Sequence, residues 1–242
     1  MDLFFITISL VSNINMKFLL CIFALVAVAT AQVVDIDNRM SLQELVAQLR
    51  MEQKFQQVSE KFEEVCPGRG DDIKEGLWAV VKCESEIEKK NETICTSIKN
   101  HFMECTKQVR GVMRDCVPAH SKDIPDLVFN SITRGFAHVC RMDGEHIFEL
   151  GNKCISKNLE SRSTSTCLRR VMTKMQEYTK NTPTKGQLCQ FASSLKGCLQ
   201  IHLSNSCQNP ITQEAFIGFY DAILTTCNQY NYVDSNDLVE RF

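Results

Sequence analysis

The chain has 242 residues, 13 cysteines and 5 prolines, with a formal net charge of −2 at pH 7. Neither the charge nor the composition suggests a nucleic-acid-binding protein. The length is sufficient to bury a hydrophobic core, so disulfides would reinforce that core and would not replace it.

The first predicted element is a signal peptide over residues 1–31. Met16-Lys17 precedes an apolar run, residues 18–29, and Ala29-Thr30-Ala31 follows the pattern of a cleavage site. The run is too short to anchor the chain stably in a membrane. Translation starts at Met1 or at Met16, because residues 1–15 carry no basic residue. Cleavage after Ala31 leaves 12 cysteines, an even number that predicts six disulfides in a secreted, extracellular protein.

Residues 32–242 then form a single secreted domain whose segments all have helical periodicity, and no strand pattern is found. The capping-box signature Ser41-Leu-Gln-Glu44 starts a helix over 41–65. A loop over 66–70 follows, and Asp71 and Asp72 cap the next helix. The later helices are expected over 95–116, 127–139, from 143 toward 154, over 167–178, over 189–207, and from Pro210 to 227. The fold class is all-α, a bundle of about eight helices.

The helix with cysteines at 189, 198 and 207 organises the second part of the chain. Nine residues rotate a helix by about 180°, so Cys189 and Cys207 share one side and Cys198 faces the other. This helix can therefore be bonded to a neighbour on each side.

The cysteine spacing predicts two similar halves, residues 66–140 and 154–227, which each hold six cysteines. The helices before the last cysteine of each half align without gaps. Apolar residues stand at the same offsets from those cysteines: Phe129, Ile132 and Phe136 before Cys140, and Phe216, Phe219 and Ile223 before Cys227.

Antiparallel packing about the turns selects one disulfide map, because residues equidistant from a turn lie side by side. In the second half it predicts Cys167–Cys198, Cys154–Cys207 and Cys189–Cys227. The repeat transfers the same order to the first half, as Cys66–Cys116, Cys83–Cys105 and Cys95–Cys140.

The stretch Cys140-Arg-Met-Asp-Gly-Glu-His146, with Ile147-Phe148 and Cys154, resembles the insect 27 kDa haemolymph glycoproteins. Leu195-Lys-Gly-Cys198 and Asn209-Pro210 agree with that pattern, and the resemblance covers roughly residues 66–227. Where the family usually has Asp-Gly-Asp-Arg, this chain has Asp143-Gly144-Glu145-His146. The resemblance implies a secreted, helical, disulfide-bonded protein of the haemolymph with no established enzyme activity.

No nucleophile elbow, zinc motif, phosphate loop or calcium loop is present, so no catalytic, cofactor or metal site is predicted. His202 is interpreted as a hydrogen-bonded core residue, and Asp143, Glu145 and His146 as the start of a helix, which favours acidic residues. Asn91-Glu-Thr93 predicts N-glycosylation at Asn91. Arg69-Gly70-Asp71 matches an integrin-recognition tripeptide, but a helix cap explains Asp71 equally well.

Two functions remain from different classes. One is a non-enzymatic carrier of a small apolar ligand between the helices, for which the partner is that ligand. The other is an extracellular interaction protein in development or defence, without a ligand cavity. A large closed apolar cavity would favour the carrier, and an exposed apolar patch on a filled core would favour the interaction protein.

Overall fold

The computed structural model describes residues 42–88, 92–155, 162–178 and 182–230. Within these ranges the chain forms nine α-helices and no strand, which confirms the all-α prediction. The signal peptide and Asn91 lie outside the described residues. Contacts divide the chain into two compact units.

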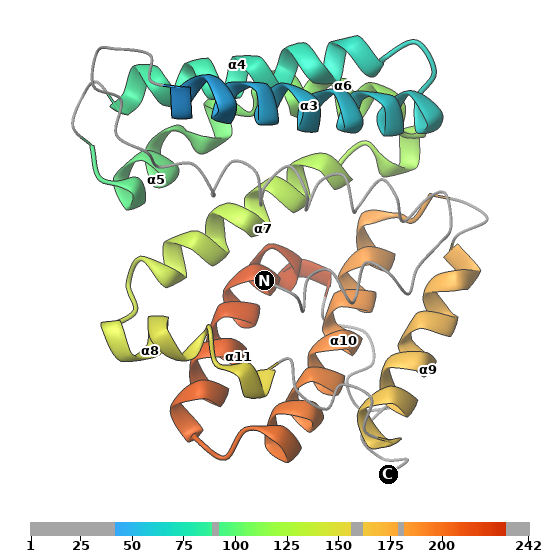
Figure 1. The fold of residues 1–242 in the computed structure, drawn as a ribbon. Coiled ribbons are helices and arrows are strands. Elements are labelled where there is room, and N and C mark those ends of the chain that lie inside the picture. Colours follow the sequence, from blue (N-terminus) through green and yellow to red (C-terminus); the bar gives the residue numbers. More distant parts are fainter. Residues whose placement is uncertain (1–41, 89–91, 156–161, 179–181, 231–242) are drawn as a thin grey trace. The chain divides into compact units, whose positions relative to one another are not determined.

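One unit contains residues 42–88, 92 and 104–117 of the described chain. Its helices are α3 (Leu42–Val65), α4 (Gly70–Glu88) and α6 (Lys107–Cys116). α4 packs along both α3 and α6, as Figure 1 shows. Their facing sides bury large apolar residues, because helices gain most of their stability from an apolar face packed on a neighbour. The most deeply buried are Phe62, Ile73, Val109 and Met113.

The turn between α3 and α4 is held by the carboxylate of Glu63. Its two oxygens accept hydrogen bonds from the backbone N–H groups of Gly68 at 2.6 Å and Gly70 at 2.7 Å. These bonds keep the pKa of Glu63 below its usual value, first through Gly68 and then through Gly70. Because Gly70 already starts α4, Asp71 and Asp72 lie in its first turn and do not cap it as predicted.

The other unit contains residues 93–103 and 118–230 of the described chain. It includes the start of α5 and five further helices. Their bounds are α5 (Ile94–Cys105), α7 (Ile124–Val139), α8 (Gly144–Glu149), α9 (Arg162–Tyr178), α10 (Lys185–Ser206) and α11 (Pro210–Leu224). α10 packs against α9 and against α11, and lies between them in Figure 1.

Helix α10 is bonded on both sides, as its cysteine spacing predicts. Cys198 joins Cys167 of α9, whereas Cys189 joins Cys227 just beyond α11. Cys207 follows the last turn of α10 and joins Cys154. Thr184 and Gln187 start α10 with a reciprocal capping box.

The interpretation of His202 as a core residue is confirmed. The side chain is 1 % exposed, and its Nε2 lies 2.9 Å from the carbonyl oxygen of Ile155. Because a carbonyl can only accept a hydrogen bond, Nε2 carries the proton. The bond ties α10 to the 3₁₀ turn Lys153–Ile155.

All six disulfides join the cysteines paired by the spacing argument. In chain order they are Cys66–Cys116, Cys83–Cys105, Cys95–Cys140, Cys154–Cys207, Cys167–Cys198 and Cys189–Cys227. Each set of six cysteines is therefore connected first to fifth, second to fourth and third to sixth. The compact units do not follow the sequence halves, since α5 begins in one unit and α6 belongs to the other.

The corresponding last helices of the two halves, α7 and α11, pack against each other in antiparallel fashion. The hydroxyl groups of Ser131 and Thr226 are 2.6 Å apart at one end of the contact. At the other end, a Cβ added to Gly218 would lie 3.0 Å from the ring of His138. Between them, a Cβ on Gly135 would lie 3.0 Å from Phe219, so glycine permits this close approach.

Several predicted helix boundaries are wrong, and three of them have a clear physical reason. The expected helix 95–116 is broken at Thr106, where ψ is 3°, so Cys95 and Cys105 lie on α5 whereas Cys116 ends the separate helix α6. α7 starts at Ile124 because a proline is tolerated in the first turn. α9 starts at Arg162 and includes the Ser/Thr-rich segment, because Thr164 is buried and tertiary packing overrides propensity.

Candidate interaction site

The segment 140–155, which we call the α8 corner, connects α7 to the second half of the chain. Cys140 ends α7 and is bonded to Cys95, with 5.7 Å between the two Cα atoms. The six-residue helix α8 follows, and Cys154 closes the segment through its bond to Cys207. Two disulfides therefore fix both ends of the α8 corner.

Asp143 is the N-cap of α8, which confirms the helix-start interpretation of this acidic stretch. Its Oδ1 accepts a hydrogen bond from the backbone N–H of His146 at 2.9 Å and lies 2.8 Å from Nδ1 of the same residue. The backbone bond, then the ring bond, lower the pKa of Asp143. The carboxylate is thereby engaged in holding the helix start.

α8 is fixed to the first turn of α11 by polar side chains. The hydroxyl of Thr212, which is fully buried, donates to Oε2 of Glu149, and Asn152 donates to the same oxygen at 2.7 Å. The hydrogen bond from Thr212 contributes most to lowering the pKa of Glu149, and the bond from Asn152 lowers it further. His146 Nε2 also faces Glu214 of α11, 4.0 Å from its Oε2. A helix of only six residues is therefore held in one orientation.

The contacts of His146 predict a titration that can be measured. The hydrogen bond to Asp143 raises its pKa above 6.5, partial burial opposes the rise, and the charges of Asp143, Glu214 and Glu145 add smaller contributions. The stabilisation is complete below pH 6.5 and is lost as the pH rises through the raised value. NMR titration of the His146 ring should give a pKa above 6.5 that falls in Asp143→Asn. Glu214→Gln should change the pKa of His146 less than Asp143→Asn does. Equal changes in the two variants would contradict the assignment of Asp143 as the main cause.

The α8 corner carries two of the three exposed large apolar side chains of the described chain. Phe148 is 85 % exposed and Ile147 is 47 % exposed, both on α8. The third such residue, Ile94, is 56 % exposed and precedes Cys95, whose disulfide reaches Cys140 at the start of the corner. We call these three residues the apolar trio.

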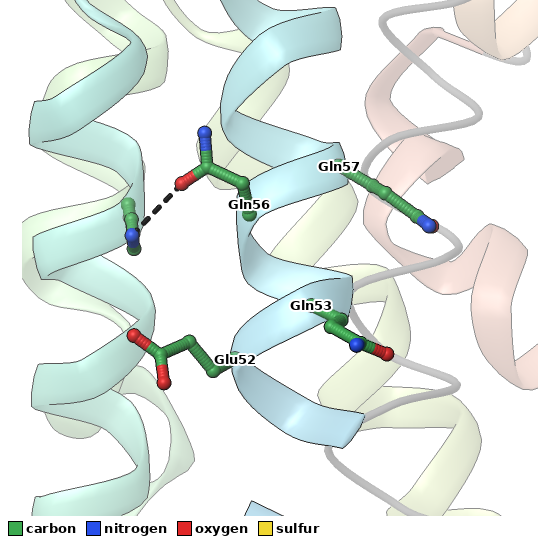
Figure 2. A pocket seen from close by; sticks show the side chains of 5 residues that line it. Glu52, Gln53, Gln56 and Gln57 are labelled. Atoms are coloured by element: carbon green, nitrogen blue, oxygen red, sulfur yellow. Dashed lines mark hydrogen bonds between the residues drawn. The ribbon is translucent and has the colours of Figure 1, made fainter. Parts of the chain in front are cut away.

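Figure 2 shows a different feature, a shallow groove on α3 and α4. The residues that line it are all of polar or charged types, and Lys74 donates a hydrogen bond to Gln56 at 2.8 Å across it. The lining residues are Glu52, Gln53, Gln56, Gln57 and Lys74. An open surface of this kind does not have the apolar walls that a small apolar ligand requires.

The tripeptide Arg69-Gly70-Asp71 is built into the start of α4. Arg69 pairs through Nε with Asp72 and through Nη2 with Asp115 at 3.2 Å. Gly70 is buried and is the first residue of the helix, whereas Asp71 is exposed. The arginine and the glycine thus stabilise the turn, and the tripeptide is not presented as an exposed loop.

The part of the chain that the structure describes contains no cluster of three or more residues able to hold a metal ion. Within the same ranges, no helix combines the length and apolar character needed to cross a membrane.

The exposure of Phe148 was not predicted from the sequence. Ile147-Phe148 is an apolar pair, and such a pair is usually interpreted as core. One signal was available, because neighbouring residues point about 100° apart on a helix, and a helix of one or two turns cannot bury both against a single neighbour.

The comparisons with known proteins place the chain in a family. No curated protein and no solved structure matches it. Residues 78–228 match the model of the DUF1397 family, which is described as a protein of unknown function. That range covers more than half of the chain. It includes the α8 corner and both cysteines of five of the six disulfide bonds. The chain therefore belongs to the DUF1397 family.

Proposed function

We propose that the protein is a secreted, non-enzymatic interaction protein of insect haemolymph that presents the apolar trio to a protein partner. The observation that carries this proposal is the exposure of Phe148 on a helix that is fixed in place. Aromatic side chains in such positions contribute strongly to protein–protein interfaces.

The extracellular setting is supported by the disulfide bonds. Six disulfides form and persist in oxidising compartments and are rare in the cytosol. The signal sequence before Gln32 and the sequon at Asn91 agree with this setting, and both remain predictions. The resemblance to the insect 27 kDa haemolymph glycoproteins supports the choice of haemolymph.

The rigidity of the α8 corner supports its use as a binding surface. Exposing a large aromatic ring to water is unfavourable, at about 25 cal/mol per Å² of apolar area. The disulfides, the Asp143 cap and the Glu149–Thr212 bond order the helix before any partner arrives. Binding then loses little conformational entropy, which favours affinity.

The carrier of a small apolar ligand is the alternative. It requires a closed apolar cavity, which the open groove on α3 and α4 does not provide. Mass spectrometry of the native protein from body fluid separates the two hypotheses. A stoichiometric bound lipid would support the carrier and would contradict the proposal.

The proposal predicts that Phe148→Ser abolishes a specific protein interaction. The wild type and the variant would be immobilised and exposed to haemolymph proteins at physiological salt, and retained proteins would be quantified by mass spectrometry. The same proteins should be retained by Gln200→Ala, an exposed substitution on α10 that serves as the matched control. Equal retention by the wild type and Phe148→Ser would contradict the proposal.

A further inference from the structure

The exposed side of α8 lies opposite the side that holds this helix on α11 (Figure 1). His146 faces Glu214 of α11, with 4.0 Å between Nε2 and Oε2. Gly144 and Phe148 stand two residues before and after His146, which places each of them about 200° round the helix from it. Both are exposed. The side of α8 that carries Phe148 therefore faces away from α11.

A glycine leaves open space between the two apolar side chains of α8. Ile147 and Phe148 lie three and four residues after Gly144, so they are its neighbours on the helix surface. Both lean toward Gly144, because side chains on a helix tilt toward its N-terminus. Outside the local backbone, no atom of the described chain would lie within 4 Å of a Cβ added to Gly144. We call this space the Gly144 gap, and it has an apolar side chain on each side.

Two acidic side chains flank the Gly144 gap. Glu145 precedes Phe148 by three residues, and Asp143 precedes Ile147 by four, so each carboxylate neighbours one apolar side chain. Glu145 is exposed, and the side chain of Asp143 is 67 % exposed. Asp143 also caps α8, so Glu145 is the carboxylate that we expect to meet a partner.

The charge beside the Gly144 gap is negative. Neither α8 nor α11 contains a lysine or an arginine. The nearest basic residues in the sequence, Arg141 and Lys153, lie before and after α8. A partner with positive charge at this place is therefore favoured, because complementary charges steer association and select the partner.

We propose that the protein partner inserts one apolar side chain into the Gly144 gap and places a lysine or an arginine beside it, against Glu145. This inference rests on the proposed function and names the kind of segment that the partner presents. The inserted side chain packs between Ile147 and Phe148 and removes apolar surface from water. The basic residue fixes the orientation of the segment, because charge pairs contribute more to specificity than to affinity.

A second copy of this chain fits the same face less well. In a two-fold symmetric dimer, one surface patch meets the identical patch of the other copy. The carboxylates of Glu145 and Asp143 would then meet the same carboxylates of the second copy, and like charges across an interface are unfavourable. A dimer that is detected by analytical ultracentrifugation and is lost in Phe148→Ser would overturn the proposal.

The test begins with the selection of random phage-displayed peptides on the immobilised wild-type protein. Peptides that also bind Phe148→Ser are removed. The remaining peptides should share an apolar residue next to a lysine or an arginine, and one of them, made synthetically, is the probe for dissociation constants. Remaining peptides without a basic residue, or no peptide that distinguishes the two proteins, would overturn the proposal.

Gly144→Leu distinguishes a defined gap from a surface that is only apolar. The open space accommodates the leucine, which is also the better helix former. The leucine fills the gap, so the peptide should bind about tenfold more weakly or less. A surface that is only apolar would bind the peptide equally or more tightly, because its apolar area has increased, and that result would overturn the proposal. Circular dichroism checks that the variant retains its helices.

Glu145→Lys tests the charge beside the gap. The peptide should bind about fivefold more weakly at low salt, and the difference should shrink as the salt concentration rises. The matched control is Glu75→Lys, which makes the same change in net charge at an exposed position of α4 and should bind as the wild type does. Equal weakening in both variants, or in neither, would overturn the proposal.

The retention of haemolymph proteins separates this inference from the proposed function. If Phe148→Ser loses those proteins while Gly144→Leu and Glu145→Lys retain them, only the present inference fails. If Phe148→Ser retains them as the wild type does, the proposed function fails as well.

Discussion

Replacing Cys189 and Cys227 together with alanine is expected to lower the free energy of unfolding by about 2–5 kcal/mol. The bond closes 38 residues of chain, so its loss enlarges the unfolded ensemble. Both sulfur atoms also lie in a buried cluster with Leu127, and their removal leaves a cavity there. Urea unfolding followed by circular dichroism measures the change.

The control is Cys95→Ala/Cys140→Ala, whose bond closes 45 residues but joins two exposed cysteines. Loop entropy alone would make the two losses equal to within about 0.2 kcal/mol. We expect a larger loss for the Cys189–Cys227 pair, because only that pair contributes to packing. A larger loss for the exposed pair would contradict the role given to the buried one.

The disulfide map could be predicted because cysteine spacing and turn positions are both readable from the sequence. In a helical hairpin, distance from the turn selects the partner, and the opposite faces of Cys189 and Cys198 separate their two partners. The same map follows in the first half, although Thr106 breaks the corresponding helix there. The disulfide connectivity therefore follows from the order of the cysteines along the chain and does not require that any one helix be straight.

The helix starts that were missed depended on tertiary contacts. Propensity disfavours a helix through residues 162–166, yet Thr164 is buried and the helix extends through them. The candidate site was not predicted because its main residue is exposed although its type suggests burial. Phe148 has the chemistry of a core residue, and only the shortness of α8 and its attachment to α11 leave it exposed.

Gly135→Leu is expected to lower the free energy of unfolding by about 1–3 kcal/mol or more. A Cβ at this position would lie 3.0 Å from Phe219 and 3.1 Å from Ile223, so a leucine must push α7 away from α11. The cost exceeds the gain of up to about 1 kcal/mol that replacing a helical glycine brings. Thermal and urea unfolding should both report the loss.

The matched control is Gly111→Leu in α6. No atom lies within 4 Å of a Cβ built there, so the helix gains from the better helix former and the stability should rise by about 0.5–1 kcal/mol. Shortening Phe219 to alanine in the Gly135→Leu background should recover part of the loss, because it removes the side chain in conflict. Two outcomes would contradict the close approach of α7 and α11 as the reason for glycine at position 135. One is a Gly135→Leu protein as stable as Gly111→Leu, and the other is no recovery of stability by Phe219→Ala.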